Sequence, residues 1–169
     1  MITSRRTFLH YCSLSAAALG LNHCKLGLLQ KALANPNGPS VIWLIGSACT
    51  GCSVSFLNRI SDKVVDVLAG AVNLIFHPTL MASAGETSVA ALKQVYNSGN
   101  YILVLEGAVP TAFGGGACVV YSYHGVEVTF QQAVQELSAR AAQVVCVGTC
   151  ASFGGIPASG SNPTKAMSV

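Results

Sequence analysis

The sequence predicts an α/β fold built on a doubly wound parallel sheet. Short apolar runs alternate with stretches of helical length, and this alternation indicates right-handed crossovers between parallel strands that are covered on both faces. Of the 169 residues, 51% are hydrophobic and 9% are charged. This composition excludes a disordered chain and supplies enough apolar side chains for the core of one ordinary domain.

The expected elements follow from the apolar pattern in chain order. Continuous apolar runs predict strands at residues 41–45, 72–76, 101–105 and 143–147. Helical periodicity predicts helices at residues 54–60, 62–71, 86–96 and 130–142, and the first of these helices is expected to begin at Ser53. A hairpin at residues 118–128 turns at His124-Gly125. Residues 35–40 hold two prolines and a glycine and form a linker before the first strand.

Thiol and carboxylate side chains follow three of the predicted strands. Cys49 and Cys52 come after the first strand, Glu106 after the third, and Cys150 after the fourth. Ligands of parallel sheets bind outside the carboxyl ends of the strands, so we expect these residues to converge on one site. Thiolates in such a group bind zinc or an iron-sulfur cluster, and Gly51 lets backbone amides approach the cluster sulfurs. A thioredoxin-like dithiol is the alternative for an isolated CxxC pair, and the third thiol counts against it.

Cys146, Cys118, Glu86 and Glu106 can also be interpreted individually. Cys146 lies within a predicted strand and is expected to be a buried, packed side chain. Cys118, near the glycine-rich residues 114–116, is a weaker ligand candidate. Glu86 is expected to be an acidic residue at a helix N-terminus. Glu106 is either a solvated cap at a strand end or a carboxylate that tunes the charge of the site.

Residues 1–34 have the features of a twin-arginine export signal. The pattern Ser-Arg-Arg-Thr-Phe-Leu at residues 4–9 precedes an apolar stretch at residues 14–21. Ala-Leu-Ala at residues 32–34 is a small-residue processing site. This route carries proteins that have already folded, which predicts a periplasmic protein that receives its cofactor before export.

The remaining chain is nearly neutral and has an odd number of cysteines. Two of the seven cysteines lie in residues 1–34, which leaves five, and an odd number favours metal ligation over a disulfide framework. Four of the nine basic residues also lie there, so five basic residues face six acidic ones and nothing indicates nucleic-acid binding. So few charges predict a surface that meets an obligate protein partner, although a Ser- and Gly-rich free surface is the alternative.

Several motifs together resemble the small subunit of nickel-iron hydrogenase. They occur in family order and cover essentially all of the chain after the signal. They are the Cys-Thr-Gly-Cys-Ser turn at 49–53, His-Pro-Thr-Leu-Met-Ala at 77–82, Ala-Gly-Glu at 84–86, Glu-Gly-Ala-Val-Pro-Thr at 106–111, Gly-Thr-Cys-Ala-Ser-Phe-Gly-Gly at 148–155 and Asn-Pro-Thr at 162–164. The resemblance implies a flavodoxin-like domain at residues 35–169 that holds the proximal 4Fe-4S cluster.

The resemblance also implies a set of ligands. Cys49, Cys52 and Cys150 match three ligands of the proximal cluster, and the family's fourth lies in a Gly-Cys-Pro-Pro stretch beyond Val169. The C-terminal region that binds the medial and distal clusters is likewise expected only in a longer chain. The residues implied around the cluster are Gly51, Glu106 and Thr149.

The expected function is electron transfer during hydrogen oxidation or evolution. The resemblance implies no catalytic residue in this chain, because the nickel-iron centre belongs to the large subunit of a heterodimer. Electrons would pass onward to a carrier such as a cytochrome, and membrane attachment through partners is left open. One alternative is an exported iron-sulfur or zinc-stapled binding or assembly domain without redox turnover. Another is the cluster subunit of quinone-reducing complexes, against which the export signal counts.

Overall fold

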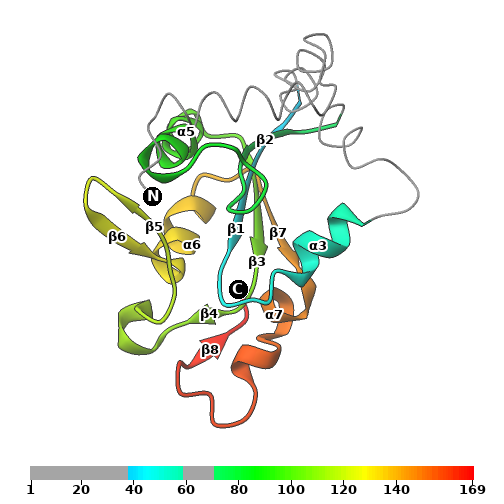
Figure 1. Cartoon of the computed structure of the whole chain (residues 1–169), viewed down its shortest axis with the longest axis vertical. Helices are drawn as coiled ribbons and strands as arrows, with labels where there is room; N and C mark the ends of the chain where they lie inside the picture. The colour runs from blue at the N-terminus through cyan, green and yellow to red at the C-terminus, as the bar shows by residue number, and fades with distance from the viewer. Residues whose placement is uncertain (1–37, 59–70) are drawn as a thin grey trace, which may run out of the picture.

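A four-stranded parallel sheet forms the centre of the molecule (Figure 1). The computed structural model describes residues 38–58 and 71–169. The strand order is β2-β1-β3-β7, which confirms the predicted α/β fold with a parallel sheet. The strands are β1 (Ser40–Ile45), β2 (Asn73–Phe76), β3 (Ile102–Glu106) and β7 (Gln143–Val147). The export signal and all but the last residue of the helix predicted at 62–71 lie outside the described residues.

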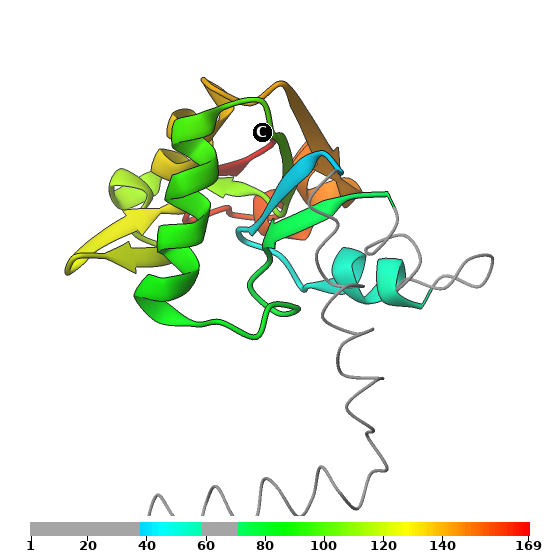
Figure 2. The same cartoon turned by 90° about the horizontal axis from the view of Figure 1, so that it is seen from above.

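Helices lie on both sides of this sheet. Helices α5 (Gly85–Ser98) and α6 (Phe130–Ser138) lie on one side, and α3 (Gly51–Leu57) lies on the other (Figures 1 and 2). Because side chains alternate along a strand, Ile42 packs with the α5 and α6 core while its neighbour Trp43 packs on the opposite face near Phe56 of α3. The sheet is therefore covered on both faces, as a doubly wound arrangement requires.

Two antiparallel strand pairs form small sheets separate from the central one. The predicted hairpin is confirmed as β5 (Val119–Tyr123) and β6 (Val126–Thr129). Its turn residues His124 and Gly125 both have positive φ, which suits the tight turn of a two-residue hairpin. A second pair, β4 (Val109–Pro110) with β8 (Ala166–Met167), was not predicted.

Some boundaries differ from the predicted ones. Helix α3 begins at Gly51 instead of Ser53, because Thr50 has the left-handed φ of 62° and the helix follows directly. Helix α6 starts at a capping box between Thr129 and Gln132, but it ends at Ser138 instead of residue 142. Its end is early because the Ala142 amide donates to the Tyr101 carbonyl at 2.9 Å, which already belongs to the approach to β7.

Three short helical segments complete the described chain. They are η1 (Ala112–Gly115), α7 (Gly148–Phe153) and η2 (Ile156–Ala158). Helix α7 follows β7 without an intervening loop and contacts β3 as well as β7. Among residues 38–58 and 71–169, no helix has the length and apolar character needed to cross a membrane.

Two buried tyrosines give a matched test of the core. The Tyr101 hydroxyl donates to the Leu137 carbonyl, whereas the Tyr121 hydroxyl has no hydrogen-bond partner among the described residues. Tyr101→Phe should therefore lower the free energy of unfolding by about 0.5–1.5 kcal/mol, and Tyr121→Phe should leave it unchanged or raise it. Urea unfolding of both variants measures the difference. Equal losses in the two variants would contradict this account of the core.

Candidate functional site

The first pair of cysteines lies where β1 runs into α3. After β1, the Gly46 amide donates to the Glu106 carbonyl at 2.7 Å, and Ser47 forms an isolated antiparallel bridge with Ala108. These bonds hold the β1 loop beside the end of β3. Cys49 is exposed and Cys52, in the first turn of α3, is partly buried.

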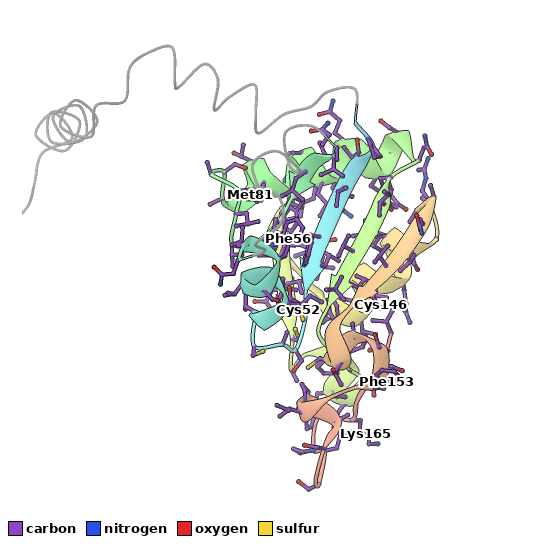
Figure 3. All side chains as sticks on the ribbon, turned by 90° about the vertical axis from the view of Figure 1, so that its right-hand side faces the viewer. Cys52, Phe56, Met81, Cys146, Phe153 and Lys165 are labelled. Carbon is purple, nitrogen blue, oxygen red and sulfur yellow. The ribbon has the colours of Figure 1, made fainter. Side chains whose placement is uncertain are left out.

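The third cysteine approaches this pair through α7. Gly148, the first residue of α7, has a φ of 81°, and a Cβ atom built there would lie 2.2 Å from the Cys52 sulfur. Any larger side chain at residue 148 would displace that sulfur. Cys150 then lies in the same helix, within its first turn. Figure 3 shows Cys52 at the end of the sheet where α7 follows β7.

Glycines also lie beside the other two sulfurs. A Cβ at Gly51 would be 3.0 Å from the Cys49 sulfur, and one at Gly155 would be 2.8 Å from the Cys150 sulfur. Each thiol of the group thus has a glycine against it. This arrangement leaves space at the sulfurs that ordinary side chains would fill.

The thiols and a carboxylate interact electrostatically. Burial raises the pKa of the Cys52 thiol above its usual value, and the nearby Glu106, Cys49 and Cys150 raise it further. The five cysteines of the described chain are free thiols. No three His, Cys, Asp or Glu side chains within residues 38–58 and 71–169 converge closely enough to hold a single metal ion. The raised pKa favours the protonated Cys52 thiol. A cation bound among these sulfurs would have the opposite effect and favour the thiolates.

Glu106 is buried and accepts four hydrogen bonds. Its side chain is 1% exposed, which rules out the solvated strand-end cap. Oε1 accepts from the Cys52 and Ser53 amides at 3.1 and 3.3 Å. Oε2 accepts from the Trp43 indole at 3.2 Å and from the Ser53 hydroxyl. A group that only accepts is a carboxylate, and this one joins β3 to β1 and to the Cys52 turn.

The contacts of Glu106 extend to His77, which the sequence did not identify as part of the site. The Ser53 hydroxyl lies 3.2 Å from His77 Nε2. Burial lowers the pKa of His77, although Glu106 opposes this shift. Two features of the sequence could have pointed to these contacts: a histidine directly after the apolar strand β2, and the single tryptophan in β1. Neither residue type indicates by itself which partner it meets.

The other predicted residues have mixed outcomes. Cys146 is exposed on β7, so the expectation of a buried packed side chain is wrong. The cause is its position, because β7 is the outer strand of the described sheet and pairs only with β3 there. Cys118 packs against the α5 and α6 core. Thr149 is exposed beside Cys150, and Glu86 lies in the first turn of α5 as predicted.

Large apolar side chains are exposed on the three short helical segments. Phe113 of η1, Phe153 of α7 and Ile156 of η2 are 82%, 81% and 83% exposed. Segment η1 contacts α6, whereas α7, which carries Phe153 and Cys150, contacts η2 with its Ile156. Exposed apolar side chains on contacting segments, such as Phe153 and Ile156, indicate an interaction site.

The sequence matches a known family of oxidoreductase subunits. Residues 49–169 match the family described as NADH ubiquinone oxidoreductase, 20 Kd subunit, and the chain belongs to that family. It is 38% identical over 177 residues to the periplasmic NiFeSe hydrogenase small subunit of Desulfomicrobium baculatum, an alignment that covers 100% of this chain and 56% of that protein. It is 34% identical over 167 residues to the periplasmic NiFe hydrogenase small subunit of Solidesulfovibrio fructosivorans, covering 98% and 52%.

Solved structures give the same relationship. The reduced, active NiFeSe hydrogenase of Desulfomicrobium baculatum matches with a TM-score of 0.76 and 40% identity, covering 78% of this chain and 50% of that chain. The oxidised recombinant NiFeSe hydrogenase of Desulfovibrio vulgaris Hildenborough matches with a TM-score of 0.77 and 40% identity, covering 79% and 48%. The chain thus corresponds to the N-terminal region of hydrogenase small subunits and spans about half the length of the curated relatives it matches.

Replacing the Glu106 carboxylate should destabilise the fold. In Glu106→Gln, an amide NH₂ replaces one oxygen and meets two donors, so we expect a loss of roughly 1.5–3 kcal/mol in the free energy of unfolding. The matched control is Glu127→Gln, at an exposed position of β6. It should change the free energy of unfolding by less than about 0.5 kcal/mol. Chemical denaturation of both variants is the measurement. A Glu106 variant as stable as its control would show that the four hydrogen bonds do not hold the turn.

Proposed function

We propose that this chain is the electron-transfer small subunit of a nickel-iron hydrogenase and that Cys49, Cys52 and Cys150 bind its proximal 4Fe-4S cluster. The observation that carries the proposal is the group of free thiols at the carboxyl edge of the sheet, each with a glycine beside its sulfur. Family membership supports it, since residues 49–169 include all three cysteines.

The residues present fit an iron-sulfur cluster. Cysteine thiolates are the usual ligands of such clusters, and a cluster supplies reversible one-electron transfer when bound. Cys52 is held by its own amide, which donates to Glu106. Glycines at residues 51, 148 and 155 keep side chains away from the sulfurs. The negative charges that raise the pKa of Cys52 suit a site that receives cationic iron.

The fourth ligand is proposed to lie in the part of hydrogenase small subunits that extends beyond the region this chain matches. The relatives extend well beyond the matched region. Strand β8 leads the chain back to α7, where the Val169 amide donates to the Ala151 carbonyl at 3.0 Å. Residues after Val169 would therefore begin next to Cys150. The medial and distal clusters belong, by the same proposal, to that following region.

The partner is proposed to be the large subunit that carries the nickel-iron centre. The exposed Phe153, in the same helix as Cys150, and Ile156 on the contacting η2 support a protein interface beside the thiols, and the low content of charged residues, 9%, agrees. Hydrogen chemistry belongs to that partner. This chain's residues contribute by binding the cluster, excluding water around it and setting its charge environment, before electrons leave to a carrier such as a cytochrome.

Loss of one thiol tests the ligand assignment. In the heterodimer, Cys49→Ala should abolish the iron and acid-labile sulfide of the proximal site, because each iron needs its thiolate. Cys146→Ala, which removes another exposed cysteine, should retain both. Metal analysis with EPR of the reduced protein reads out the result. A full iron complement in Cys49→Ala would exclude this ligand set. Stoichiometric zinc in the wild-type protein would instead favour the alternative of a zinc-binding domain without redox turnover.

Export is proposed to depend on the paired arginines of the signal. Relatives are named as periplasmic hydrogenase small subunits, and residues 5 and 6 are both arginine. Replacing both, Arg5→Lys and Arg6→Lys, should keep the chain in the cytoplasm, while Lys25→Gln should not. Fractionation followed by immunoblotting measures the distribution. Unchanged periplasmic accumulation of the double variant would rule out the twin-arginine route.

A further inference from the structure

His77 links a distant loop to the cysteine turn. It follows β2 directly, its side chain is 0% exposed, and it reaches Ser53 across 24 residues of sequence. Its ring also lies 5.1 Å from the Trp43 ring, tilted by 43°. Because Trp43 donates to Glu106 as well, the imidazole is packed between two groups that contact the same carboxylate.

The contacts of the ring define its tautomer. The Thr79 amide donates to His77 Nδ1 at 3.2 Å, so Nδ1 is the acceptor and the proton of the neutral ring lies on Nε2. Nε2 faces the Ser53 hydroxyl oxygen at 3.2 Å. That hydroxyl in turn donates to Glu106 Oε2. The hydrogen bonds therefore run in one direction, from Thr79 through His77 and Ser53 to Glu106.

This direction has a consequence for Cys52. A hydroxyl that accepts a hydrogen bond becomes a stronger donor through its own proton, so His77 strengthens the bond from Ser53 to Glu106. The same carboxylate accepts the amides of Cys52 and Ser53. Both the backbone of the cysteine turn and the negative charge beside Cys52 thus depend on groups that His77 orients.

We propose that His77 is a positioning residue for the cluster site: its Nε2 proton, donated to Ser53, orients Glu106 and partly neutralises the carboxylate charge next to Cys52. The inference rests on the proposed function, since the affected property is the reduction potential of the bound cluster. His77 itself contacts none of the three cysteines in this scheme and acts through Ser53.

The test is a set of variants in the assembled heterodimer, with iron content and the midpoint potential of the proximal cluster as readouts. His77→Phe removes the donor and keeps a ring, and it should lower the potential because Glu106 keeps more of its negative charge. His77→Gln, whose amide nitrogen can donate as Nε2 does, should retain the wild-type potential. In a Ser53→Ala background, His77→Phe should cause no further shift, because the pathway is already broken.

The outcomes separate this inference from the proposed function. A fully loaded His77→Phe protein with the wild-type potential would overturn it, as would a shift that persists undiminished in the Ser53→Ala background. If His77→Phe fails to load iron, His77→Gln decides: normal loading and potential support the donor role, and failure of Gln as well overturns it. A wild-type heterodimer without proximal iron would instead contradict the proposed function.

Discussion

The buried carboxylate of Glu106 is the constraint on which the site depends. Burial of a carboxylate is costly unless its oxygens are hydrogen-bonded, and here each oxygen accepts two bonds. The donors come from β1 and from the start of α3, while the acceptor lies at the end of β3. The cysteine turn can therefore adopt its shape only when β1 and β3 are paired, which couples the position of Cys52 to formation of the sheet.

The same carboxylate makes the site unfavourable for free thiolates. Its charge and the neighbouring thiols raise the pKa of Cys52, in addition to the effect of burial. The fold thus gathers groups of like charge that repel one another when ionised. A bound metal centre relieves this repulsion, so metal binding and ionisation of the thiols would be coupled. For the proposed cluster-binding subunit, this coupling would be a physical reason to insert the cofactor in the compartment where the chain folds.

The sheet could be predicted because it follows from local patterns. Apolar runs identified the strands, and the cysteines follow β1 and β7 as the sequence places them. Their convergence on one cluster at the shared carboxyl edge stays a prediction. The Ser53–His77 and Trp43–Glu106 contacts could not be predicted, since they join residues 24 and 63 positions apart and depend on how loops pack. Cys146 was misjudged for a related reason, because periodicity identifies a strand but not whether that strand lies at the edge.

The exposed surface near the thiols completes the physical argument for a partner. Cys49 is exposed, and Phe153 and Ile156 are more than four-fifths exposed. Removing apolar surface from water is favourable at about 25 cal/mol per Å², so a partner that covers these side chains gains binding free energy there. The same cover would exclude water from the sulfurs and strengthen the hydrogen bonds around Glu106. Docking of the partner and tuning of the proposed cluster would therefore arise from one surface.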